Sequence, residues 1–85
     1  MPEISRFLGI VIAMYYREHG KPHFHAAYGE YNITVEIESG IVNGDFPNRA
    51  LNHVLEWNSI HKNELLNNWE QLKDRKRPNK ILPLE

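Results

Sequence analysis

Two histidines separated by one residue make residues 22–26 (PHFHA) the most unusual stretch of the sequence. On a β-strand, side chains at i and i+2 point to the same face, so His23 and His25 would lie about 6.6 Å apart along the strand. Such a pair can ligate a divalent metal, with Glu36 or His19 as a third ligand. It can also supply the general base and the general acid of metal-independent RNA cleavage. In a third interpretation, the two histidines are ordinary polar residues on an open sheet face.

The connection before this motif, residues 17–22 (REHGKP), is rich in charge. It contains Glu18 and several basic residues, and Gly20 and Pro22 mark it as a loop. A basic loop beside a histidine face can hold a phosphate group. The candidate phosphate-binding residues are Arg17, Lys21 and His19.

Alternating polar and apolar residues predict the hairpin that would position the motif. Residues 23–28 and 31–37 each alternate as half-buried strands do. Between them, Gly29-Glu30 suits a two-residue type II′ turn. The predicted pairs are Tyr28 with Tyr31, Ala26 with Ile33, Phe24 with Val35, His25 with Thr34, and His23 with Glu36.

This register predicts a catalytic group of His23, His25 and Glu36 on one face. Glu36 can orient the His23 imidazole from the neighbouring strand. If the protein cleaves RNA, we expect His25 and His23 to act as acid and base. If it binds a metal, the same three residues are the candidate ligands.

The remaining elements complete an α+β fold. Residues 8–16 (LGIVIAMYY) read as one strand covered on both faces, and residues 41–43 as a short fourth strand that pairs Ile37 with Val42. Residues 47–76 are helical in pattern, with Asp45 as the N-terminal cap. We expect a break near Asn58-Ser59, with Ser59 capping a second helix, and a continuous kinked helix is the alternative.

The predicted architecture is thus a four-stranded antiparallel meander (ββββαα) with two C-terminal helices packed on one face. The other face stays uncovered and carries the histidines. In the helices, one apolar stripe includes Trp69, and we expect both tryptophans in the core. Trp57 falls outside this single stripe, which favours a break between two helices. The stripe consists of Leu51, Val54, Leu55, Leu65, Leu66, Trp69 and Leu72.

Length and composition restrict the class of protein. The chain has 85 residues, 41% hydrophobic and 25% charged, which is typical of one small folded domain. We expect residues 1–78 to form it and residues 79–85 to be an extended tail, since Pro78 and Pro83 forbid a helix. The absence of cysteine excludes disulfides and thiolate zinc sites. No apolar run could span a bilayer, so we expect a cytoplasmic protein without membrane contact.

The predicted meander leaves the strand of residues 8–16 at an edge of the sheet, although it is the most apolar strand of the chain. Exposed edges of this kind promote aggregation and are usually covered. We expect a second chain there. It is either a twin subunit, which makes a homodimer through this strand a candidate assembly, or the partner protein, which would add a strand to the sheet. The alternative cover is the tail at residues 80–84.

Several motifs together resemble a small bacterial family known as domain of unknown function 4160, over about residues 1–78. They are the strand FLGIVIAMYY, the PHFHA motif, the following Tyr28-Gly29, and the EW…H…ELL…W spacing at residues 56–69. The resemblance implies a short cytoplasmic protein encoded beside another small protein, as in toxin–antitoxin pairs, and transfers no catalytic roles.

We therefore predict a toxin–antitoxin-type protein that acts through a protein partner encoded by the adjacent gene. RNA is a further candidate ligand, with metal-independent cleavage by the histidine pair as the candidate activity, and no cofactor is expected. The alternatives are a non-enzymatic protein-binding module and a small divalent-metal-binding protein.

Overall fold

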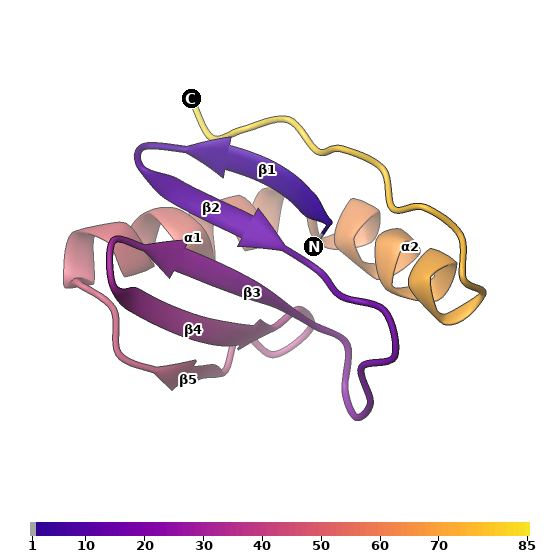
Figure 1. The fold of residues 1–85 in the computed structure, drawn as a ribbon. Helices are drawn as coiled ribbons and strands as arrows, with labels where there is room; N and C mark the ends of the chain where they lie inside the picture. Colours follow the sequence, from indigo (N-terminus) through magenta and orange to yellow (C-terminus); the bar gives the residue numbers. More distant parts are fainter. Residues whose placement is uncertain (1) are drawn as a thin grey trace.

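The computed structural model describes residues 2–85 and contains one antiparallel sheet followed by two helices (Figure 1). The strands lie side by side in chain order, β1-β2-β3-β4-β5. The predicted α+β meander with two C-terminal helices is confirmed, except that the sheet has five strands and not four. The elements are β1 (Glu3–Phe7), β2 (Ile10–Ala13), β3 (His23–Tyr28), β4 (Tyr31–Glu36), β5 (Val42–Gly44), α1 (Asn48–Ile60) and α2 (Lys62–Lys73).

The additional strand arises from a tight turn at Leu8-Gly9, so the prediction of a single strand over residues 8–16 is wrong. Phe7 pairs with Ile10 across this turn. Both turn residues have positive φ, 51° at Leu8 and 79° at Gly9, as a type I′ hairpin turn requires. β2 is consequently an interior strand between β1 and β3. The strand edge at residues 8–16 that suggested a homodimer is therefore paired, and β1 is the edge of the sheet.

The β3–β4 hairpin has the predicted register, with His23 opposite Glu36 and Gly29 at a φ of 58° in the turn. The next turn differs from the prediction. The amide of Gly40 donates to the carbonyl of Glu36, so this turn starts earlier than expected. Val42 therefore pairs with Val35 and not with Ile37, and the last strand is shifted by one residue to Val42–Gly44.

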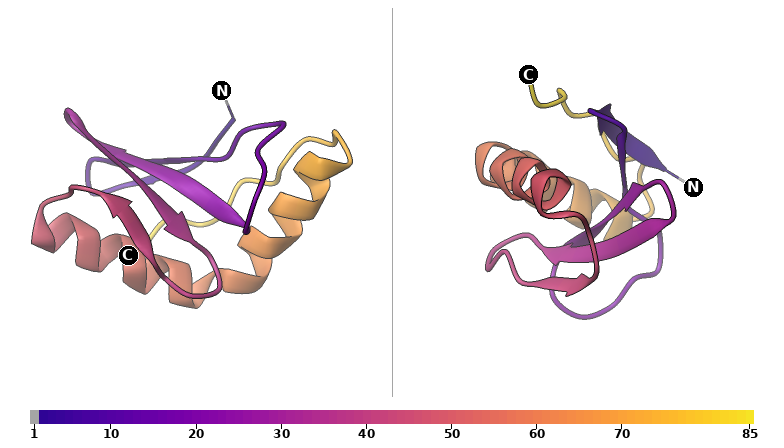
Figure 2. Two further views of the ribbon diagram at one scale, coloured as in Figure 1. Left: turned by 90° about the horizontal axis from the view of Figure 1, so that it is seen from below. Right: turned by 90° about the vertical axis from the view of Figure 1, so that its left-hand side faces the viewer.

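The two helices meet at His61, and α2 bends away from the axis of α1 (Figure 2). A break was predicted, but two residues earlier. Ser59 caps nothing, because its hydroxyl donates to the Glu56 carbonyl within α1. The start of α1 has Pro47 at the cap position and no side-chain capping bond, so Asp45 is not the cap. Neither helix has the length and apolar character that crossing a membrane requires.

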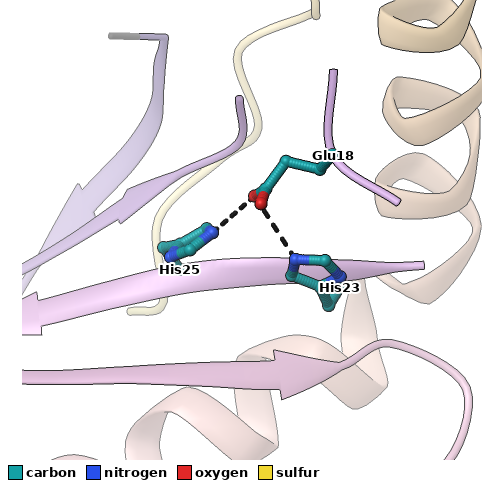
Figure 3. A group of neighbouring side chains, drawn as sticks. All are labelled: Glu18, His23 and His25. Carbon is teal, nitrogen blue, oxygen red and sulfur yellow. Dashed lines mark hydrogen bonds and ion pairs between the residues drawn. The ribbon is translucent and has the colours of Figure 1, made fainter. Parts of the chain in front are cut away.

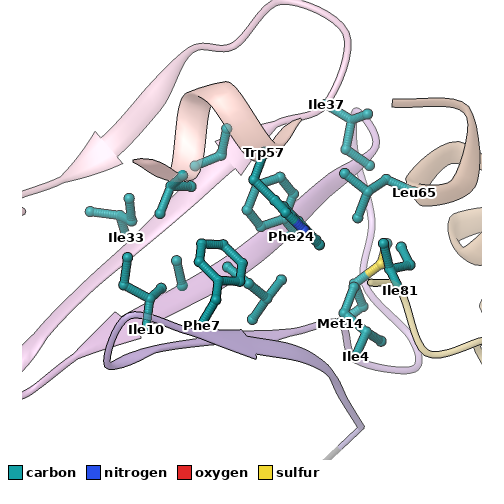
Figure 4. Close-up of a cluster of buried hydrophobic side chains, with 14 of the residues drawn as sticks. Ile4, Phe7, Ile10, Met14, Phe24, Ile33, Ile37, Trp57, Leu65 and Ile81 are labelled. Atoms are coloured by element: carbon teal, nitrogen blue, oxygen red, sulfur yellow. The ribbon is translucent and has the colours of Figure 1, made fainter. Parts of the chain in front are cut away.

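Apolar side chains from the sheet, both helices and the C-terminal segment form one core (Figure 4). Trp57 lies at its centre, fully buried, with its ring centroid 5.4 Å from that of Phe7 and 5.6 Å from that of Phe24. Trp57 falls outside a single stripe drawn through residues 47–76 because the two helices bend at His61, so one stripe does not describe both of them. Trp69 is buried, as predicted.

Residues 79–85 are extended, and they run along the outer edge of β1 (Figure 1). Ile81 is only 5% exposed, and its amide donates to the Ile4 carbonyl at 2.8 Å. The indole Nε1 of Trp57 donates to the Leu82 carbonyl at 2.9 Å. This segment therefore completes the core and covers the β1 edge.

Candidate functional site

The connection between β2 and β3 folds back over the start of β3. Arg17 has a φ of 65° and Gly20 a φ of 92°, two left-handed residues that reverse the chain direction. Gly20 adopts this conformation freely, whereas Arg17 does so at a cost. The amide of Ile37 donates to the Pro22 carbonyl and fixes the end of the loop beside the sheet.

This loop brings the Glu18 carboxylate onto the two histidines of β3 (Figure 3). Glu18 Oε1 lies 2.5 Å from His25 Nε2 and 3.3 Å from His23 Nε2. One ligand atom from each residue lies within 4.8 Å of the other two. All three side chains are half-buried, so the group is shielded without being closed off.

The second ring nitrogen of His23 is also held. His23 Nδ1 lies 2.9 Å from the Lys21 carbonyl, which can only accept, so the nitrogen donates. When the ring is neutral, this tautomer leaves a lone pair on Nε2, the atom that faces Glu18. Two lone-pair atoms at 3.3 Å repel each other unless a proton or a metal cation lies between them.

Aromatic rings border the group on two sides. The Tyr15 ring meets the His25 ring edge-on, with centroids 4.6 Å apart. The Trp69 ring, from α2, lies 5.1 Å from the His23 ring. The expectation of an uncovered histidine face is therefore wrong, because the β2–β3 loop and α2 both reach this end of the sheet.

Glu36 is opposite His23 in the register, yet the two side chains are not hydrogen-bonded to each other. Glu36 Oε1 accepts from the Ser39 hydroxyl at 2.9 Å. Lys21 is separated from the other predicted phosphate-binding residues. It lines a small pocket of about 220 Å³ together with His23, Thr34, Glu36 and Asn43.

Arg17 and His19 belong to a larger, open pocket of about 840 Å³ between the loop and α2. Glu18 lines this pocket as well and so connects it to the histidines. Sequence reasoning missed Glu18 as a partner of the histidines, although its place in the charged loop next to the motif was a signal. The lining residues are Tyr15, Tyr16, Arg17, Glu18, His19, Gly20, Trp69, Leu72, Lys73 and Arg75.

Comparison with known proteins finds one match, to a family model. No curated protein and no solved structure matches the chain. A family model described as "Domain of unknown function (DUF4160)" matches residues 9–70, which is well over half of the chain and includes Glu18, His23, His25 and Trp69. The chain therefore belongs to this family of unknown function, as its motifs suggested.

Proposed function

We propose that the protein binds a divalent transition-metal ion through Glu18, His23 and His25 and uses it for hydrolysis in the adjoining pocket. Two imidazoles and one carboxylate are the protein ligands of several hydrolytic zinc sites, which keep a further position for water or substrate. Imidazole nitrogen also suits nickel and copper, so the ligands define a class of metals and not one element.

The observation that carries this proposal is the convergence of two Nε2 atoms on one carboxylate oxygen, with His23 Nδ1 held by a backbone carbonyl. A metal-ligating histidine commonly donates its other ring N–H to a carbonyl or carboxylate, which fixes the ring and its tautomer. The Lys21 carbonyl supplies that contact for His23. A cation between the ligands also removes the repulsion between His23 Nε2 and Glu18 Oε1.

The chemistry follows from the neighbourhood of Glu18. A zinc ion in such a site lowers the pKa of its bound water to about 7, which makes hydroxide available as a nucleophile. Because Glu18 also lines the 840 Å³ pocket, an ion held by its carboxylate would lie beside a molecule bound there. In this proposal His23 and His25 would act as ligands and not as acid and base.

Metal-dependent thermal stabilisation tests the proposal. The chelator-treated protein is melted alone and with Zn²⁺, Ni²⁺ or Mg²⁺, and bound metal is counted by elemental analysis. A metal at 100 times its Kd stabilises the native state by about 2.7 kcal/mol, which raises Tm by roughly 10 °C or more in a domain of this size. We expect this rise with Zn²⁺ or Ni²⁺, one bound ion per chain, and little effect of Mg²⁺.

Two variants locate the ion. Glu18→Gln keeps the size of the side chain and removes its charge, and we expect it to lose most of the stabilisation. His53→Ala, on α1 and outside the cluster, removes an imidazole that is not a proposed ligand and should keep the full rise. No rise in the wild type, or an equal loss in both variants, would refute the site.

Metal-independent RNA cleavage is the second candidate, and the unequal surroundings of the two histidines favour it. His25 Nε2 contacts Glu18 at 2.5 Å, whereas His23 Nδ1 donates to the Lys21 carbonyl, so the two rings have different hydrogen-bond partners, as an acid and a base require. RNA loss that a chelator does not affect would support this activity against the metal-dependent one.

The toxin–antitoxin association and the protein partner stay predictions. A protein with neither the metal-dependent activity nor RNA cleavage would be the non-enzymatic binding module.

A further inference from the structure

The pocket beside the cluster gathers cationic side chains from two distant segments. Arg17 comes from the β2–β3 loop, Lys73 is the last residue of α2, and Arg75 lies two residues after it. Within residues 2–85, neither guanidinium forms a hydrogen bond or an ion pair, and Lys73 has only a 3.8 Å contact with Glu70. Glu18 is the one carboxylate in the lining, so the fixed charges of the pocket sum to a positive value. An ion on Glu18 would raise that charge further, which favours an anionic ligand.

Both arginines occupy left-handed backbone positions, where glycine is the least costly residue. Arg17 has a φ of 65° and Arg75 a φ of 60°. The conformation of Arg75 results from the way α2 ends. The Arg75 amide donates to the Leu72 carbonyl, and the Lys76 amide donates to the Gln71 carbonyl. These bonds form the helix-terminating motif that usually contains glycine. The left-handed backbone at each arginine thus costs conformational free energy, and binding of an anionic ligand to the guanidinium can offset this cost.

An aromatic ring lies beside these charges. Tyr16 lines the pocket and is 43% exposed, and within residues 2–85 its ring stacks on no other. Tyr15 and Trp69 are already engaged with His25 and His23. A volume of 840 Å³ is far larger than a phosphate ion needs and falls within the range of pockets for small organic ligands.

We infer that this pocket binds a single-stranded nucleic acid, with backbone phosphate on Arg17, Lys73 and Arg75 and a base stacked on Tyr16. Positive side chains next to an available aromatic ring are the general elements of single-strand binding. A duplex keeps its bases stacked inside and offers no face to Tyr16. The inference rests on the proposed function for the chemistry that follows binding, because the ligand would lie beside Glu18.

Fluorescence anisotropy with labelled single-stranded RNA and DNA of one sequence, about ten nucleotides long, tests the inference. The protein is measured with Zn²⁺ and again with chelator. Arg17→Gly/Arg75→Gly removes two charges while fitting the backbone, and Lys76→Ala/Arg77→Ala removes two charges from exposed residues outside the pocket. Tyr16→Ala is paired with Tyr31→Ala, which removes a tyrosine of similar exposure from the start of β4.

We expect the zinc-loaded double glycine variant to have a Kd at least about tenfold higher than the zinc-loaded wild type, and Tyr16→Ala a Kd several-fold higher. Both controls should stay within about twofold, and duplex RNA or inorganic phosphate should compete poorly. Stronger binding of RNA than of DNA identifies RNA as the ligand, and the reverse identifies DNA.

The inference fails if the loaded wild type does not bind either strand, if the controls lose as much affinity as the pocket variants, or if duplex competes equally. The proposed metal site is judged separately. The double glycine variant keeps Glu18, His23 and His25, so its Zn²⁺-dependent rise in Tm should equal that of the wild type. Absence of a Zn²⁺-dependent rise in the Tm of the wild type would refute the metal site. Binding of the single strand in the presence of chelator, if it depends on the pocket residues, would still support the nucleic-acid ligand.

Discussion

Replacing Ile81 by alanine tests whether the C-terminal segment is part of the core. Ile81 is 5% exposed and packs with Ile4, to whose carbonyl its amide donates. The next residue, Leu82, is 75% exposed, so Leu82→Ala is a matched control in the same segment. Both variants shorten an aliphatic side chain to a methyl group, but only one of them empties a place in the core.

The expected cost follows from what the side chain buries. Three buried carbon groups at about 0.8 kcal/mol each give about 2.4 kcal/mol, and a remaining cavity adds to this within the usual 2–5 kcal/mol for Ile→Ala. The loss cannot exceed the docking free energy of the segment, because a segment that gains nothing from packing simply detaches. We therefore expect about 2–3 kcal/mol, out of a total of roughly 4–13 kcal/mol for 85 residues.

Thermal melts followed by circular dichroism measure this difference. At 4–8 °C per kcal/mol, Ile81→Ala should melt about 10–20 °C below the wild type, and Leu82→Ala within about 3 °C of it. If the segment detaches, Trp57 loses its acceptor at the Leu82 carbonyl, and its fluorescence should shift to the red. Equal melting temperatures for the two variants would show that Ile81 contributes nothing to the core and would refute the packing argument.

Three further changes have defined outcomes. Leu8→Asn, before Gly9 in the β1–β2 turn, should raise the free energy of unfolding by about 1 kcal/mol, because asparagine tolerates a φ of 51° better than leucine; an unchanged Tm would contradict this. Trp69→Ala should cost about 3–5 kcal/mol in a denaturant titration, and a cost below 1 kcal/mol would place Trp69 at the surface. The hydrogen bond from Arg6 lowers the pKa of Glu3 below its ordinary 4.5, so its small stabilising effect is present at neutral pH and lost as the pH falls from about 4.5. Glu3→Gln should therefore match the wild type in acid and melt slightly lower at neutral pH and low salt.

The β3–β4 hairpin could be predicted to the residue, because strict alternation and Gly29 both fix its register. The β1–β2 hairpin could not, because the apolar run over residues 8–16 hides a turn whose first residue is leucine. Gly9 inside that run was the only local indication of the turn. Apolar content alone does not separate one long strand from the end of a hairpin.

The site was predictable only as far as the sheet determines it. His23 and His25 lie on one face because of strand periodicity, and His23 lies opposite Glu36 because of the register. The carboxylate that reaches them is Glu18, and its place depends on the left-handed backbone of Arg17 in the loop. Loop conformations follow no periodic pattern in the sequence. The sequence therefore predicts the positions of His23 and His25, which lie on a strand, but not that of Glu18, which lies in a loop.

The order of the strands has a consequence for the way the chain folds. Each strand pairs with the one that precedes it in sequence, so almost all sheet contacts close short loops, and such topologies fold fast for their size. The contact of Lys80 Nζ with the Glu3 carbonyl instead joins residues 77 positions apart. Closing that loop costs the most chain entropy, so we expect the final segment to dock after the sheet has formed. In native-state hydrogen exchange, the amide of Ile81 should then open more often than the amides that join β3 to β4.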